Sequence, residues 1–114
     1  MYDDTVRYAE NSAWLPIAGM VWPKIEPEIV FKMQRPLGAG DVDAAAVLGA
    51  AEWIALGFEI IDCVFPDWKF QPPDFVASFG LHAGLMVGEP LRVQSEMIPA
   101  LVDQLPSFTV RISV

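Results

Sequence analysis

The sequence predicts an α+β fold with several strands and two or three short helices. β-Branched and aromatic residues concentrate in four strand-like runs, at residues 24–33, 58–65, 85–87 and 108–113. Helix signals, namely first-turn Asp or Pro residues and 3,4 spacing of apolar residues, recur between these runs, at residues 41–57, 72–79 and 95–105. A chain of 114 residues is long enough for one small domain. We therefore expect a single domain over residues 1–114.

Composition and charge exclude several classes of protein. Apolar residues make up 54% of the chain, enough for a sizeable core and too many for a disordered segment. The formal net charge is −8 and no basic run occurs, so we expect no binding to nucleic acid or to an anionic membrane surface. Cys63 is the single cysteine, which excludes an intrachain disulfide and a Cys/His zinc set.

The sequence predicts a soluble, cytoplasmic protein. Asp3 and Asp4 stand where a signal peptide would carry positive charge before an apolar run. The longest apolar region, residues 44–65, is interrupted by three acidic residues, so we do not expect it to span a membrane.

The run over residues 24–33 holds the most informative pattern. Its side-chain period of two predicts that Glu26 and Glu28 point to the same side of a strand. Pro27 cannot donate a hydrogen bond to a neighbouring strand, so this strand is expected at a sheet edge or a bulge. The paired glutamates repel each other, and a divalent cation would offset that repulsion. The alternative is that both lie on the solvated face of a half-buried strand.

The other elements follow from local signals. Asp41 and Asp43 are expected to open a helix that Gly57 ends. In the strand that follows, regular alternation would point Glu59 and Asp62 to opposite faces, and a bulge would change that. The last run, residues 108–113, alternates apolar and polar residues, as a half-buried strand does.

Four motifs together resemble one branch of the fumarylacetoacetate hydrolase family, the 2-keto-4-pentenoate hydratases and 4-oxalocrotonate decarboxylases. They are Ile-Glu-Pro-Glu-Ile at 25–29, Phe-Glu-Ile-Ile-Asp at 58–62, Asp-Trp-Lys-Phe at 67–70 and Ala-Gly-Leu-Met-Val-Gly at 83–88. The resemblance covers roughly residues 2–113 and implies a mixed β-roll, usually assembled into dimers or higher oligomers. It also implies Mg²⁺ or Mn²⁺ held by Glu26, Glu28 and Glu59.

The implied metal site suits the implied chemistry. Carboxylate oxygens are the ligands of hard cations, and three protein ligands leave coordination positions open. A 2-oxo acid could fill two of them, and the cation would stabilise the enolate formed from it. Hydration, decarboxylation and C–C hydrolysis share this requirement, so the resemblance does not select among them. We expect a small 2-oxo or 2-hydroxydienoic acid as the substrate.

Three further residues are candidates for catalysis, each with a structural alternative. Lys69 could bind a substrate carboxylate or move a proton, or it could be a surface lysine between two aromatic residues. Asp62 could orient Lys69 or a water, or it could cap the end of its strand. His82 follows a mostly apolar run, residues 77–81, where hydratases of this family are polar. It could replace those polar groups or be structural.

Three hypotheses about function stay open at this point. Family members are much longer, and this chain resembles their central part. It could be a metal-dependent enzyme module, a truncated and inactive member that serves as an oligomeric binding protein, or a domain completed by a separate partner chain. An unpaired strand over residues 108–113 and the apolar composition predict a homodimer or larger oligomer, with that strand paired across chains.

Overall fold

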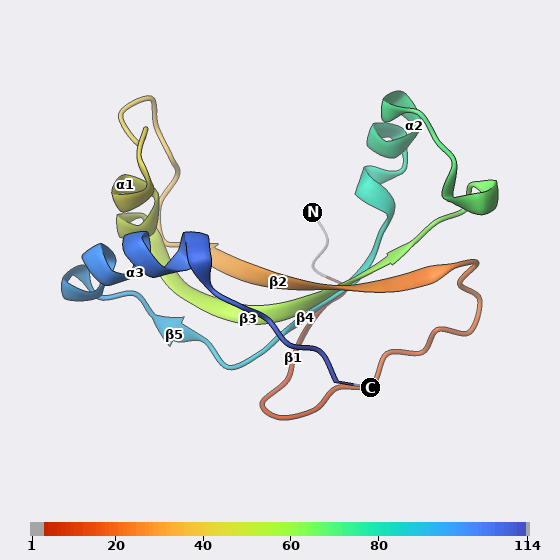
Figure 1. The fold of residues 1–114 in the computed structure, drawn as a ribbon, viewed down its shortest axis with the longest axis horizontal. Helices are drawn as coiled ribbons and strands as arrows, with labels where there is room; N and C mark the ends of the chain where they lie inside the picture. The colour runs from red at the N-terminus through yellow and green to blue at the C-terminus, as the bar shows by residue number, and fades with distance from the viewer. Residues whose placement is uncertain (1–3, 114) are drawn as a thin grey trace. The chain divides into compact units, whose positions relative to one another are not determined.

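The computed structural model describes residues 4–113 (Figure 1). These residues divide into two compact units, one formed by residues 4–28 and 56–89 and the other by residues 29–55 and 90–113. The long strands β2 and β3 each contribute residues to both units. The expectation of a single domain over residues 1–114 stays a prediction.

A five-stranded mixed sheet carries the fold. The strands are β1 (Val6–Tyr8), β2 (Pro23–Met33), β3 (Ala51–Asp62), β4 (His82–Val87) and β5 (Leu91–Arg92). Their order is β1-β4-β3-β2, and β5 also pairs with β3. β1 is parallel to β4, whereas β3 is antiparallel to both β4 and β5. This mixed sheet with a few short helices confirms the predicted α+β class.

The first unit places β3 and β4 side by side. Their register runs from Gly57 opposite Val87 to Ile61 opposite His82, with a shift between Ile60 and Ile61. Such an irregularity interrupts the strict alternation that a regular strand would impose between Glu59 and Asp62.

A small core of the first unit lies at the end of β3. Ile61, Cys63 and Leu81 are buried, and three aromatic residues pack against them: Phe65, Trp68 and Phe70. Cys63 is therefore a small core residue. Two 3₁₀ turns and one helix connect β3 to β4, namely η1 (Pro66–Trp68), α2 (Pro72–Ala77) and η2 (Phe79–Leu81). The predicted short helix is thus confirmed, with its prolines in the first turn.

The second unit corrects one predicted helix. Asp43 caps α1 (Ala44–Gly49) by accepting a hydrogen bond from the Ala46 amide at 2.8 Å, as predicted. The helix then stops at Gly49, so the expectation of a helix continuing to Gly57 was wrong. β3 begins at Ala51 because the next residues pair with a distant strand, Ile54 lying opposite Leu91 of β5. Long-range pairing overrides the local helical spacing there.

The end of the chain brings one confirmed element and one correction. The predicted helix at 95–105 appears as η3 (Ser95–Met97), α3 (Ile98–Gln104) and η4 (Leu105–Ser107). Residues 108–113, expected to be a strand, have no regular structure. No strand of the described chain pairs with this segment, so its backbone groups lack the partner that a strand needs. The alternating apolar side chains are about half exposed there.

Two remaining expectations concern the strand at the edge and the membrane. β2 ends the strand order of the described sheet, which confirms the edge position predicted from Pro27.

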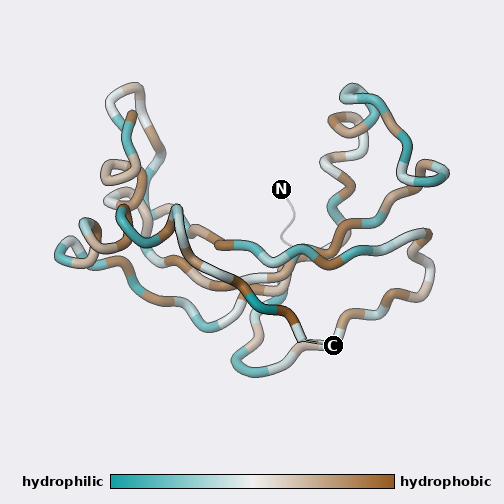
Figure 2. Tube along the Cα trace, in the orientation of Figure 1, coloured by the Kyte–Doolittle hydropathy of each residue, from teal (hydrophilic) through white to brown (hydrophobic). Residues whose placement is uncertain are grey.

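Apolar and polar residues are interspersed along the chain (Figure 2). Among the helices of residues 4–113, none has the length and apolar content needed to cross a bilayer.

Candidate metal centre

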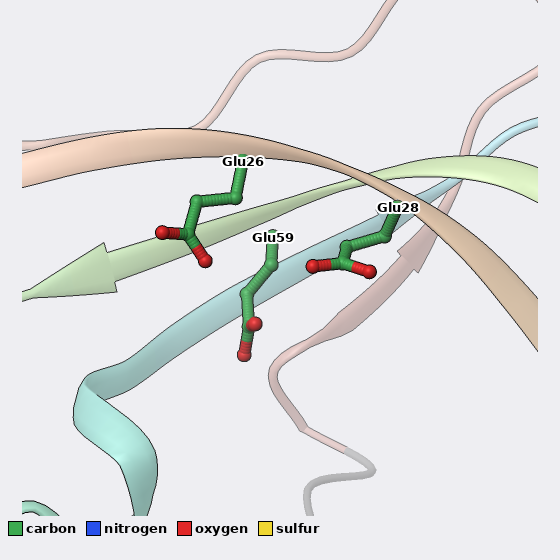
Figure 3. A group of neighbouring side chains, drawn as sticks. All are labelled: Glu26, Glu28 and Glu59. Carbon is green, nitrogen blue, oxygen red and sulfur yellow. The ribbon is translucent and has the colours of Figure 1, made fainter. Parts of the chain in front are cut away.

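Three carboxylates gather in the first unit. Glu26 and Glu28 extend from β2, and Glu59 extends from the neighbouring strand β3 (Figure 3). One oxygen from each of the three carboxylates lies within 4.8 Å of one oxygen from each of the others. Glu26 and Glu28 are exposed, and Glu59 is half-buried. The structure therefore brings together the three residues that the resemblance implied as metal ligands.

Asp62 fixes the start of β2 against the end of β3. Its carboxylate accepts hydrogen bonds from the backbone amides of Val21, at 2.9 and 3.0 Å, and Trp22, at 2.8 Å. β2 begins at the next residue, Pro23. Because Asp62 ends the strand that carries Glu59, these bonds hold the start of β2 close to that strand. The contacts of Asp62 are thus with backbone, and its predicted catalytic role stays a prediction.

Glu59 is held by the only histidine of the chain. His82 Nδ1 lies 2.6 Å from Glu59 Oε1, and His82 Nε2 lies 2.8 Å from Thr5 Oγ1. The imidazole is 9% exposed, whereas the Glu59 side chain is 28% exposed. Of the three residues predicted for catalysis, His82 is therefore the one seen in direct contact with a carboxylate of the cluster.

Strained backbone precedes His82. Phe79, Gly80 and Leu81 have φ values of 53°, 71° and 65°, a conformation that non-glycine residues rarely adopt. Such strain persists where the surrounding structure over-determines it. Here Leu81 is 4% exposed within the core of the first unit, and its burial holds this turn in place.

Lys69 lies in an open setting. Its Nζ is 3.5 Å from Asp67 Oδ2, and its side chain is 82% exposed. An ion pair at this distance and exposure contributes little to stability. A role for Lys69 in catalysis stays a prediction.

Lys24 is a candidate that was not predicted from the sequence. Its Nζ lies 3.5 Å from the centroid of the Trp68 ring, a cation–π distance. Alternation along β2 places Lys24 on the same face as Glu26 and Glu28. The signal was present in the sequence, because Lys24, Glu26 and Glu28 follow one another at intervals of two.

A mostly apolar cavity of the first unit is separate from the acidic cluster. It measures about 390 Å³ and is lined mainly by apolar groups, among them Ile25, Phe58, Ile60 and Met86. Ile25 and Phe58 are next in sequence to Glu26 and Glu59, so alternation places them on the opposite face of their strands. The carboxylates therefore face away from this cavity.

Comparisons with known proteins identify relatives of this chain. No protein-family model matches it. The chain is 39% identical over 87 residues to 2-hydroxyhexa-2,4-dienoate hydratase from Comamonas testosteroni, an alignment that covers 75% of this chain and 33% of that protein. It is 35% identical over 81 residues to 4-oxalocrotonate decarboxylase from a Pseudomonas species, covering 71% and 31% respectively. A 2-keto-4-pentenoate hydratase from Paraburkholderia phymatum is 31% identical over 78 residues.

A solved structure shares the fold. The 4-oxalocrotonate decarboxylase from Pseudomonas putida G7, complexed with magnesium and adipate, matches 79% of this chain with a TM-score of 0.67 and 22% sequence identity. The match covers 34% of the decarboxylase. The chain thus spans about a third of the length of the relatives it matches. The aligned part belongs to the 2-keto-4-pentenoate hydratase and 4-oxalocrotonate decarboxylase branch of the fumarylacetoacetate hydrolase family, as its sequence motifs predict.

Proposed function

We propose that this chain is a divalent-metal-binding module that acts on small 2-oxo or 2-hydroxydienoic acids. The observation that carries the proposal is the approach of Glu26, Glu28 and Glu59 to within 4.8 Å of one another. Two comparisons support it: the relatives are named for dienoate hydration or oxalocrotonate decarboxylation, and the structural neighbour was solved with magnesium.

The donor set suits Mg²⁺ or Mn²⁺. All three candidate ligands offer carboxylate oxygens, which hard cations prefer, and their combined negative charge calls for a counter-ion. When bound, such a cation would supply a Lewis acid that favours the enolate form of a 2-oxo acid. The chain itself contributes the placement of the ligands: β2 supplies a pair at an interval of two, and β3 supplies the third from the adjacent strand.

A cationic side chain on the same strand as two of the glutamates would recognise the acid substrate. Lys24 shares a face of β2 with Glu26 and Glu28, and Trp68 holds its ammonium group at 3.5 Å from the ring. An ammonium group in this place can pair with a substrate carboxylate at the edge of the acidic cluster. The structural neighbour was solved with adipate, a dicarboxylate, which fits a substrate of this class.

A second candidate function is a metal-binding protein that does not turn over substrate. The segment that leads to His82 favours it, because Phe79 and Leu81 stand where hydratases of the family carry polar residues, and Leu81 is buried in the core. In this case the acidic cluster would bind a cation, and the module would serve in an oligomeric assembly or be completed by a partner chain. We also propose that the chain forms part of a mixed β-roll like that of the longer family members.

The experiment that tests the proposal measures loss of 2-hydroxypenta-2,4-dienoate with Mg²⁺, alongside a panel of 2-oxo acids. Turnover that requires Mg²⁺ and disappears in Glu26→Gln supports the enzyme. Metal binding without turnover of any acid on the panel favours the second candidate. The absence of both metal binding and turnover would overturn the proposal.

A further inference from the structure

We infer that His82 is a positioning residue, which orients Glu59 for a divalent cation by bridging it to Thr5. This inference rests on the proposed metal site and deepens it. In the sequence His82 was a candidate for catalysis, either in place of missing polar groups or as a structural residue. Its surroundings assign it a third role, because both of its ring nitrogens have partners and its side chain is 9% exposed.

The chemistry of the contact fixes how the imidazole is used. A carboxylate only accepts hydrogen bonds, so His82 Nδ1 donates to Glu59 Oε1 at 2.6 Å. In the neutral ring Nε2 then accepts, and the Thr5 hydroxyl donates to it at 2.8 Å. One oxygen of Glu59 is thereby held by the histidine, and because a carboxylate has about four acceptor sites, Glu59 can accept this bond and still offer an oxygen to a cation. Metal-binding carboxylates commonly have this kind of outer hydrogen bond.

Both ends of the bridge are anchored by backbone. On one side, the backbone oxygen of Thr5 accepts a hydrogen bond from the Leu85 amide at 3.0 Å, so Thr5 is held against β4. On the other side, His82 pairs with Ile61 at the shift between Ile60 and Ile61, two residues beyond Glu59. The imidazole is therefore set between two strands rather than carried on a free loop.

The turn before His82 adds a further constraint. Phe79, Gly80 and Leu81 all have positive φ, and the buried Leu81 side chain keeps this turn closed. A residue that begins a strand directly after such a turn has few alternative directions for its side chain. The arrangement restricts Glu59, whose carboxylate would otherwise sample several rotamers in its half-buried position.

The test compares Mn²⁺ affinity in variants of the intact chain by calorimetry, with the electron paramagnetic resonance spectrum of bound Mn²⁺ as a second readout. His82→Ala removes the donor and should weaken Mn²⁺ binding by about 10- to 100-fold, as outer-shell substitutions do. His82→Asn keeps an N–H donor near the position of Nδ1 and should restore most of the affinity. Thr5→Val removes the hydroxyl that holds Nε2 and should give a smaller loss.

A matched control separates positioning from general stability. Val87→Ala removes a side chain that is 1% exposed in the same strand, β4, so it should lower the melting temperature without changing the Mn²⁺ affinity. Wild-type affinity in both His82→Ala and Thr5→Val would overturn the inference while leaving the metal site in place. If His82→Ala does not fold, Thr5→Val decides the question, and wild-type Mn²⁺ affinity in that variant overturns the inference. Absence of Mn²⁺ binding in the wild type would instead overturn the proposed function, and this inference with it.

Discussion

The carboxylate of Asp62 accepts hydrogen bonds from the backbone amides of Val21 and Trp22, at distances between 2.8 and 3.0 Å. These residues are separated by about forty positions in the sequence and lie where one glutamate-bearing strand ends and the other begins. The contact therefore links the two strands that carry the acidic cluster. It explains how an exposed edge strand keeps Glu26 and Glu28 beside Glu59.

The first prediction concerns this link. Asp62→Ala removes the charged acceptor of hydrogen bonds from two exposed backbone N–H groups, which water can then bind, and should lower the free energy of unfolding by about 1 kcal/mol. Chemical denaturation checks that value, and Mn²⁺ affinity should fall as well because β2 is less well placed. Glu89→Ala removes an exposed acid of the same unit and serves as the control. Equal stability of the two variants would show that the Asp62 contacts do not hold β2.

The second prediction distinguishes two lysines. Lys24→Met should raise the KM for an acid substrate by about 10- to 100-fold, the loss expected for a charge-assisted hydrogen bond. Lys69→Met should change it much less, because Lys69 is 82% exposed and paired only at 3.5 Å. If the chain does not turn over substrate, the dissociation constant for adipate in the presence of Mg²⁺ replaces KM. If Lys69→Met raises the KM more than Lys24→Met does, Lys69 is the better candidate for binding the substrate carboxylate, the role predicted for it from the sequence.

The acidic cluster was easier to predict from the sequence than the contact between His82 and Thr5 that holds Glu59. Strand alternation alone placed Glu26 and Glu28 together, because the period of two is a local property of the backbone. Glu59 joined them through the resemblance, since no local pattern shows which strand lies beside β2. Thr5 lies 77 positions before His82, and no local sequence pattern around either residue predicts their contact.

The errors in the fold have the same physical origin. Residues 51–57 have helical spacing, yet they form part of β3 because Ile54 pairs with β5 far along the chain. Residues 108–113 have the alternation of a strand, yet no described strand lies beside them. Local patterns predict which side chains share a face. Only the long-range pairing decides whether that face belongs to a helix, a strand or a loop.

The third prediction concerns acid stability. The pKa of Asp41 lies well below its ordinary value of 3.8, because Arg35 donates a side-chain hydrogen bond to it and the Gly38 amide donates another. A depressed pKa in the folded state gives a stabilising contribution that is fully present above about pH 4 and is lost as the pH falls through the range below. Asp41→Asn should therefore flatten the pH dependence of unfolding below pH 4. Asp103→Asn is the control and should leave that dependence as it is in the wild type.

The fourth prediction concerns assembly. Phe108, Val110 and Ile112 are 49%, 42% and 46% exposed, in a segment that alternates as a strand does. We expect a homodimer or larger oligomer in which this segment pairs with another copy, because pairing would satisfy its backbone and cover its apolar side chains. Light scattering should show the oligomer at micromolar concentration, and Val110→Asp should dissociate it. Thr109→Asp, on the alternate face, should matter less. A stable wild-type monomer would contradict the prediction.

The fifth prediction is that Mn²⁺ stabilises the wild-type chain. Binding to the folded state alone raises the free energy of unfolding by about 2.7 kcal/mol at a metal concentration one hundred times the dissociation constant. The melting temperature near neutral pH should rise accordingly. The control is Glu89→Gln, which removes one negative charge of the same unit outside the cluster.

The most direct measurement for the central claim is calorimetric titration of Mn²⁺ into the wild type, Glu26→Gln, Glu28→Gln, Glu59→Gln and Glu89→Gln. One Mn²⁺-binding site is expected in the wild type and in Glu89→Gln. Each substitution within the cluster should weaken that site strongly, because the cation loses a charged oxygen ligand. Absence of binding in the wild type, or equal binding in all five proteins, would contradict the claim that Glu26, Glu28 and Glu59 form a metal site.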